Sequence, residues 1–165
     1  MMWSAVAWVS LGLRFVGMTV IVAMLEEVFF RSALMRSLYR PKTVRDSFVQ
    51  ILTDIPGLGS YLLNYKSIRK IDKQRDVIRN AFNETPVGAM SVTNILVVGI
   101  LWCLLSHITR DWPATMVCAL GYAWVVYISN RGERKCGLGP AVWAHAITNG
   151  ILLAYVIYYG DWRFL

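Results

Sequence analysis

The sequence has few charged residues, few histidines and few cysteines. Only 16% of the 165 residues are charged and 56% are hydrophobic, whereas soluble globular proteins average about 25% charged residues. This shortage of polar surface argues against a soluble domain, and the high apolar content argues against disorder. The three cysteines (Cys103, Cys118 and Cys136) provide neither an even disulfide framework nor a CxxC metal-binding pair.

Four long apolar segments predict membrane spans instead. They cover residues 5–25, 86–106, 113–130 and 140–160, and Arg14 is the only Lys, Arg, Asp or Glu among them. Each segment has about the 17–25 residues that cross a bilayer as a helix. The uncharged N-terminal residues, and an apolar run that leads into Glu26 without a cleavage site, favour a retained span over a signal peptide. We expect a single all-α membrane domain over residues 1–165, a helical bundle with about four transmembrane helices.

The basic residues are concentrated between the first and second spans and between the third and fourth. With four spans, these two segments lie on the same side of the membrane, and the positive-inside rule predicts that this side is cytoplasmic. Both termini are then expected outside, in an orientation that suits a bacterial inner membrane. The first basic segment carries Arg40, Lys42, Arg45, Lys66, Arg69, Lys70, Lys73, Arg75 and Arg79.

The segment at about 41–85 is the only part with a soluble-looking composition. After a predicted turn over residues 55–59, apolar residues recur at helical spacing between basic ones, which predicts a basic amphipathic helix on the anionic inner leaflet. A nucleic-acid partner is not expected, because acidic residues interrupt the basic run and the aromatic residues form an apolar stripe. The stripe consists of Tyr61, Tyr65, Ile68, Ile71, Ile78 and Phe82.

A few ionisable residues lie within or at the ends of the predicted spans, where each costs about 2.5–3.5 kcal/mol on insertion scales. Glu27 and Arg31 are four residues apart, which suits a helical ion pair. Glu26 is about 100° away around the helix and remains free to point elsewhere when Glu27 pairs with Arg31. Asn149 follows His145 by four residues and shares its helix face. The full set is Glu26, Glu27, Arg31, His107, His145 and Asn149.

A carboxylate and two imidazoles on different spans can activate a water molecule for peptide-bond hydrolysis. In this interpretation Glu26 acts as general base, one imidazole assists it, and the other imidazole with Asn149 stabilises the oxyanion. For these groups to meet, residues 91–94 should protrude into the membrane interface, so that His107 lies near mid-bilayer. Water must then reach the site through a polar cavity open to the cytoplasm.

Other interpretations of the same residues remain open. The two glutamates could be acids at a helix end paired with Arg31 and Arg36, and each histidine could have a structural role. Glu26, His107 and His145 could instead hold zinc with one position left for water, although the HExxH signature is absent. A Cys103–His107 thiol–imidazole dyad is a further alternative, weakened because a buried cysteine is usually a packing residue.

Three short patterns resemble the motifs of the CPBP family, which contains the CAAX proteases and the bacteriocin-processing (ABI) membrane proteins. Glu26, Glu27 and Arg31 match its EExxxR motif, and His145 and Asn149 match its HxxxN motif. The third resembles FxxxH, with His107 in place and Cys103 where phenylalanine is usual. The motifs follow the family's order, whereas the basic insert at 41–85 is atypical. The C-terminal residues are also similar to a subgroup associated with exosortase systems.

This resemblance implies an intramembrane endopeptidase related to the Ras-converting CAAX protease. It implies that Glu26 and His107 activate water, that His145 and Asn149 form the oxyanion site, and that Glu27 and Arg31 support them. The expected partners are membrane lipid and a protein or peptide substrate, prenylated or otherwise membrane-anchored. No cofactor is implied with certainty, and zinc stays an option. The alternative is a non-catalytic immunity or scaffold protein that keeps the fold.

Overall fold

The protein is all-helical in the residues that the structure describes. The structure is a computed structural model and describes residues 5–74, 77–106, 112–133 and 135–161. Within these residues it contains eight helices, and the prediction of an all-α fold is confirmed. The first helix, residues 5–37, contains segments α1 (Ala5–Val16), η1 (Gly17–Val22), α2 (Ala23–Glu26), η2 (Glu27–Leu34) and α3 (Met35–Ser37).

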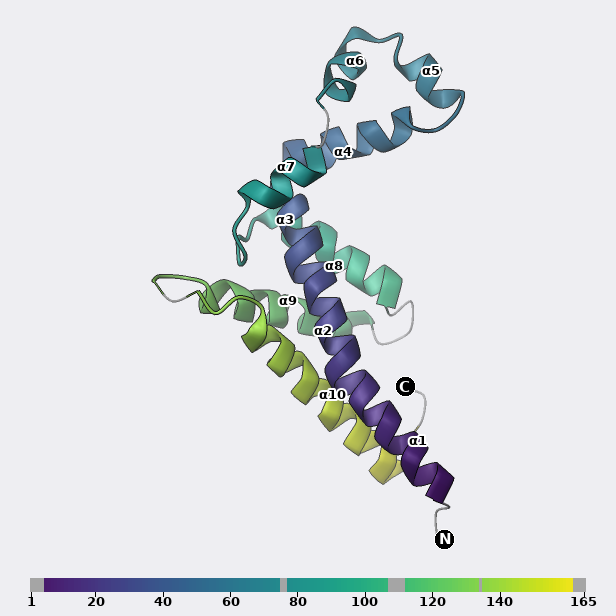
Figure 1. Cartoon of the computed structure of the whole chain (residues 1–165), viewed down its shortest axis with the longest axis vertical. Coiled ribbons are helices and arrows are strands. Elements are labelled where there is room, and N and C mark those ends of the chain that lie inside the picture. Colours follow the sequence, from purple (N-terminus) through teal and green to yellow (C-terminus); the bar gives the residue numbers. More distant parts are fainter. Residues whose placement is uncertain (1–4, 75–76, 107–111, 134, 162–165) are drawn as a thin grey trace.

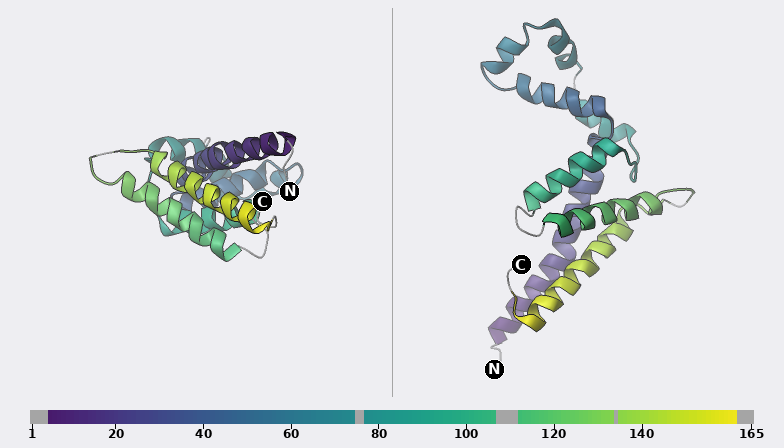
Figure 2. Two further views of the ribbon diagram at one scale, coloured as in Figure 1. Left: turned by 90° about the horizontal axis from the view of Figure 1, so that it is seen from below. Right: turned by 180° about the vertical axis from the view of Figure 1, so that it is seen from behind.

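Three of the helices are long and apolar enough to cross a membrane, which indicates an integral membrane protein. They are Trp8–Ser37 within the first helix, α9 (Trp112–Ser129) and α10 (Gly139–Tyr159). Their outer surfaces carry large exposed apolar side chains, including Leu13, Trp143 and Ile151, each at least 67% exposed. Such a surface is unfavourable in water and suits contact with lipid. Figures 1 and 2 show α10 alongside the N-terminal part of the first helix, where it contacts η1 and α2.

The predicted span over residues 86–106 is only partly helical. Helix α8 begins at Val92 and ends at Ser106, and its 15 residues are fewer than the 17–25 that usually cross a bilayer. Ser91 caps this helix: its Oγ accepts a hydrogen bond from the Asn94 N–H at 3.2 Å, and the Asn94 side chain accepts one from the Ser91 N–H at 2.8 Å. This reciprocal pair works like a capping box and sets where α8 starts.

The placement of residues 91–94 at the membrane interface stays a prediction, and within the protein Asn94 is fully buried. The Asn94 amide donates to the Met35 carbonyl at 3.0 Å, and the Ser91 hydroxyl donates to the Tyr39 carbonyl at 2.6 Å. An amide in a buried position needs such partners. These bonds hold the start of α8 against the end of the first helix.

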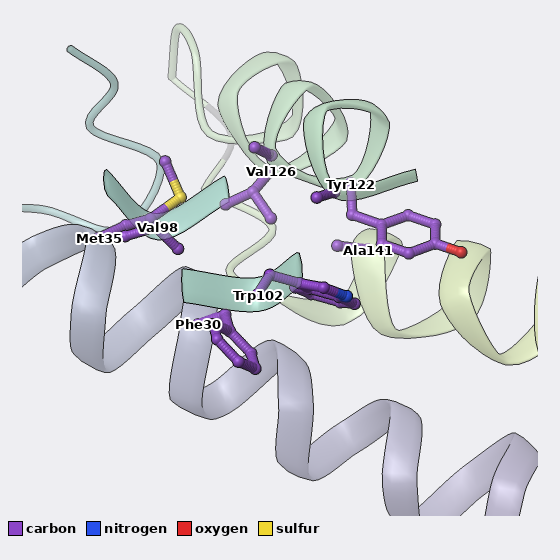
Figure 3. Close-up of a cluster of buried hydrophobic side chains, with 9 residues drawn as sticks. Phe30, Met35, Val98, Trp102, Tyr122, Val126 and Ala141 are labelled. Atoms are coloured by element: carbon purple, nitrogen blue, oxygen red, sulfur yellow. The ribbon is translucent and has the colours of Figure 1, made fainter. Parts of the chain in front are cut away.

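The buried core lies where the first helix meets α8, α9 and α10, as Figure 3 shows. Helices α8 and α9 approach closely at Gly99, where an added Cβ would lie 3.1 Å from the Met116 sulfur. Each of the four helices therefore contributes side chains to one cluster beside the ionisable residues of the first helix. The labelled members of the cluster are Phe30, Met35, Val98, Trp102, Tyr122, Val126 and Ala141.

The described residues of the 41–85 segment, 41–74 and 77–85, form four helices rather than one amphipathic helix following a turn. The chain turns back after α5, where Tyr65 has extended backbone dihedral angles (φ −84°, ψ 123°) and the Arg69 side chain donates to the Leu63 carbonyl at 3.1 Å. The predicted apolar stripe is therefore divided among separate helices. Their bounds are α4 (Pro41–Thr53), α5 (Leu58–Leu62), α6 (Lys66–Asp72) and α7 (Val77–Glu84).

These helices lie beyond the end of the first helix, with α5 and α6 on the far side of α4 from the apolar helices (Figure 1). Arg36 joins α7 to α3 because its guanidinium donates to the carbonyls of Phe82 at 2.8 Å and Thr85 at 2.7 Å. A cation at these last carbonyls stabilises a helix C-terminus. The Arg36 side chain therefore binds the C-terminal end of α7.

Candidate active site

Glu27 is the centre of a buried polar cluster between the first helix and α10. Its side chain is fully buried, and its Oε1 lies 2.9 Å from Nδ1 of His145. Its Oε2 lies 3.4 Å from Nε of Arg31, which is ion-pair distance but too long for a strong hydrogen bond. The predicted Glu27–Arg31 pair is therefore present in the structure. His145, which lies 118 positions after Glu27 in the sequence, completes the cluster.

Glu26 faces the same histidine from the other side of the ring. Its Oε2 lies 3.8 Å from Nε2 of His145, and its side chain is 25% exposed, whereas that of His145 is 6% exposed. Glu26 and Glu27 thus approach the same imidazole ring. Glu26 is the last residue of the α-helical segment α2, and the π-helical segment η2 begins at Glu27. The two adjacent glutamates face opposite nitrogens of one imidazole.

The two adjacent glutamates lie within a helix rather than at its end. The first helix continues to Ser37, so Glu26 and Glu27 lie well inside a candidate span. A π-helical segment η1 also precedes them, and near its start the Thr19 hydroxyl donates to the Phe15 carbonyl at 2.6 Å. Single π-bulges are frequent at functional sites, and here one π segment precedes the glutamate pair and a second begins at Glu27.

Aromatic side chains hold the imidazole and the guanidinium in place. Tyr122 of α9 stacks on His145 with ring centroids 4.6 Å apart and an interplanar angle of 17°. The Arg31 guanidinium carbon lies 3.5 Å from the centroid of Trp102 of α8. Such contacts stabilise a desolvated cation. Arg31 also donates to the Ala119 carbonyl at 3.0 Å, so two further helices fix the position of this charge.

Tyr122 and Trp102 were missed by sequence reasoning, although a signal was present. Aromatic residues of membrane helices concentrate near the span ends. Both of these residues lie well inside apolar helices and are at most 6% exposed. An aromatic residue at mid-helix in a chain with ionisable residues on other helices could have been taken as a partner for them.

Asn149 lies away from the glutamates. Its side-chain amide donates to the Met18 carbonyl of η1 at 3.0 Å, and Met18 precedes Glu26 by about two turns of helix. The structure therefore brings Asn149 to the first helix but does not bring its amide beside Glu26. An amide has two N–H groups, and one of them is used here.

The remaining predicted residues are only partly accounted for. His107 lies outside the described residues. Cys103 is buried, and its sulfur lies 3.8 Å from the Trp112 carbonyl, as expected for a packing residue. Among the described residues, no group of three His, Cys, Asp or Glu side chains is arranged to hold a metal. The suggested zinc ligands would include His107, so only Glu26 and His145 of that set can be placed.

The cluster has the chemistry of an oriented base. An ionised carboxylate can only accept hydrogen bonds, so the contact with Glu27 places the proton of a neutral His145 on Nδ1. Nε2 is then an acceptor that faces Glu26 across a gap of 3.8 Å, a separation at which a bridging water should be considered.

Comparisons of the chain with models of known protein families, with curated proteins and with solved structures found no match.

Proposed function

We propose that the chain is an intramembrane endopeptidase that hydrolyses a peptide bond with water activated beside Glu26 and His145. One observation carries the proposal: Glu26 and Glu27 approach the two nitrogens of a single buried imidazole, at 3.8 Å and 2.9 Å. A buried histidine oriented by one carboxylate and facing a second, partly exposed carboxylate is a typical arrangement for general acid–base catalysis. The CPBP-like motif residues support the same interpretation.

In the proposed mechanism, a water molecule occupies the gap between Glu26 and Nε2 of His145. Glu26 accepts a proton from this water as it attacks the peptide carbonyl, while Glu27 holds the imidazole in the tautomer protonated on Nδ1. Glu26 then passes this proton to Nε2 of His145, and the resulting imidazolium donates it to the leaving amine, which returns both residues to their starting states. Arg31 pairs with Glu27 and helps to hold its carboxylate in position.

His107 and Asn149 keep the roles that the resemblance implies, with conditions set by the structure. His107 is proposed as the second water-activating group. Asn149 would stabilise the oxyanion through the amide N–H that does not bond to the Met18 carbonyl, which requires the substrate to reach the level of η1. Zinc held by Glu26, His107 and His145 is tested by adding and removing a chelator.

The proposed setting is a bacterial inner membrane, with α8 as a short fourth embedded helix. Helix α8 has no charged residue and packs against η2 and α9, which supports its immersion. The basic segments would be cytoplasmic, since positive charge favours that side. The substrate is then a protein or peptide held at the membrane, with or without a prenyl group.

A non-catalytic membrane protein is the second candidate, and a specific observation favours it. Glu27 is paired on both of its oxygens, and the Asn149 amide bonds to the first helix. Such contacts also suit a purely structural network that joins helices. An immunity or scaffold protein would need the cluster only for stability and could contact its partner through residues 41–85.

The test is hydrolysis by the purified full chain in proteoliposomes. The substrates are membrane-anchored fluorogenic peptides, each made with and without a prenyl group on a cysteine. Glu26→Gln is expected to lower the rate by about 10²–10⁴-fold, the usual contribution of a general base. Glu133→Gln, which changes an exposed acid between α9 and α10, serves as the matched control and should keep the wild-type rate.

The result against catalysis is equally clear. If Glu26→Gln and His145→Gln both insert and fold normally and retain the wild-type rate, the proposed mechanism is wrong. A cellular phenotype that survives Glu26→Gln but is lost on deletion of residues 60–82 would favour the scaffold. Chelator sensitivity of the wild-type rate, restored by zinc, would show that the water is activated by metal.

A further inference from the structure

A second polar site lies between α4 and α7, at the end of the first helix. It is a pocket of about 430 Å³, a volume within the usual range for small-ligand sites. The residues of the hydrolytic cluster do not line it. Its polar lining includes Arg40, Lys42, Asp46, Gln74, Asn80 and Glu84.

The charges that line this pocket are balanced and ordered by depth. Arg40 and Lys42 are exposed, whereas Asp46 is only 1% exposed. With Glu84, the four charged lining residues sum to zero, which favours a ligand that carries both signs over a simple anion. A buried carboxylate requires compensation by cations or hydrogen bonds, so Asp46 marks the position where the positive group of a ligand would bind.

Asp46 already has one cationic neighbour but keeps capacity for another. Nε and Nη2 of Arg45 both donate to Oδ1 of Asp46, at 2.9 Å and 2.7 Å. The Arg45 side chain is 63% exposed and does not line the pocket. A carboxylate offers about four lone-pair sites on its two oxygens. A ligand ammonium group can therefore bind to Asp46 without displacing Arg45.

The position of the pocket favours a lipid headgroup as its ligand. Helix α4 begins at Pro41, shortly after the candidate span ends at Ser37, and it runs sideways from the end of the first helix in Figure 1. Phe48 and Ile51 form an exposed apolar face on α4, at 60% and 57% exposure. An exposed apolar face next to a span suits a helix that lies along the membrane surface, which places the pocket at headgroup depth.

We propose that this pocket binds the headgroup of an amine-bearing phospholipid, with the ammonium group at Asp46 and the phosphate at Arg40 and Lys42. Asn80 and Gln74 provide further polar groups along the lining. Phosphate binds lysine and arginine side chains through charge-assisted hydrogen bonds. A free phosphodiester with a primary amine has the same chemistry, so the experiment separates the two sources. The proposal is independent of hydrolysis at Glu26.

The test uses the purified, delipidated full chain and measures bound lipid by native mass spectrometry. Phosphatidylethanolamine, phosphatidylcholine and phosphatidylglycerol are added in turn in mixed micelles. Phosphatidylethanolamine is expected to bind best, since the choline headgroup cannot donate N–H hydrogen bonds and the glycerol headgroup has no cation. Asp46→Asn should weaken its binding about tenfold, as expected for the loss of one charge-assisted hydrogen bond.

Because Asp46 is buried, its substitution could also affect folding, and a second variant removes this ambiguity. Ala81→Leu fills the pocket, which Ala81 lines, while it keeps every charge, and it should cause a similar loss of binding. Arg79→Gln, an exposed charge change on α7 outside the pocket, should leave binding unchanged. Equal binding of the three lipids, or full binding by Ala81→Leu, would overturn the proposal.

Competition with glycerophosphoethanolamine identifies the source of the ligand. Displacement of the lipid only at large excess of the soluble compound supports a membrane lipid as the ligand. Displacement at equal concentration would show that the free phosphodiester binds as well as the lipid, and the assignment to lipid would then be wrong.

Discussion

Replacing the buried ion pair of Glu27 and Arg31 tests the network that orients His145. Arg31→Met keeps an unbranched side chain but removes the charge, the hydrogen bond to the Ala119 carbonyl at 3.0 Å and the contact over Trp102 at 3.5 Å. Glu27 is then buried with only the imidazole as partner. The free energy of unfolding should fall by about 3–5 kcal/mol, the usual cost of leaving a buried charge uncompensated.

Glu27→Gln has the complementary effect, because it leaves the Arg31 guanidinium buried without its ion-pair partner. We expect a similar loss of stability from this substitution alone. The double variant carries neither buried charge. Its loss should therefore be smaller than the sum of the single losses by about 1–3 kcal/mol, within the range measured for residues in contact.

The assay is denaturant unfolding of the full chain in mixed micelles, with the four proteins of the cycle measured together. Arg79→Met, at an exposed position of α7, is the control and should change the free energy of unfolding by less than about 0.5 kcal/mol. Additive losses, to within about 0.5 kcal/mol, would refute the reasoning, because they would mean that the two side chains do not interact.

Two further predictions concern the segments that position the helices. Gly59→Ala should destabilise the turn between α4 and α5, because an added Cβ would lie 1.9 Å from the Thr53 carbonyl oxygen; faster limited proteolysis of this turn is the expected result, and an unchanged rate would contradict the close approach. Ser91→Ala removes the cap of α8 and should lower the free energy of unfolding by about 1 kcal/mol. A Ser91→Thr variant, which keeps the hydroxyl, should retain most of this stability if the cap is the cause.

The membrane helices could largely be predicted from the sequence because long uncharged apolar runs have few alternatives. The third and fourth predicted spans, 113–130 and 140–160, agree with α9 and α10 to within one residue at each end. The predicted span over 86–106 begins before helix α8, which starts at Val92, because hydropathy cannot distinguish an apolar turn from an apolar helix over 86–91. The pattern of Ser91 followed by Asn94 was the available signal, as a variant of a capping box.

For the insert at 41–85, the sequence predicted the composition but not where its helices begin and end. Apolar residues recurred at helical spacing, but this periodicity does not show where a helix is interrupted. The backbone at Tyr65 is extended, and side-chain bonds to backbone carbonyls, such as that from Arg69 to Leu63, fold the chain back. These are tertiary contacts that the spacing of apolar residues does not encode.

The candidate site was predicted in its residue types but not in its geometry. The four-residue spacing of Glu27 and Arg31 correctly indicated a pair. The contact between Glu26 and His145 could not be derived from spacing along the first helix, because it depends on how α10 packs against that helix. Nothing in the sequence signals the π-helical segment η2 either. The bond from Asn149 to the Met18 carbonyl depends on how α10 packs against η1, which motif spacing cannot provide.

Imidazole nitrogen NMR tests most directly whether both glutamates meet His145. The chain has only two histidines, so protein labelled with nitrogen-15 at histidine gives signals from two rings, and His107→Ala identifies those of His145. We predict that Glu27→Gln shifts the Nδ1 signal of His145, that Glu26→Gln shifts its Nε2 signal, and that Glu133→Gln shifts neither. Signals of His145 that stay unchanged in both Glu26→Gln and Glu27→Gln would contradict the convergence on which the proposed hydrolysis depends.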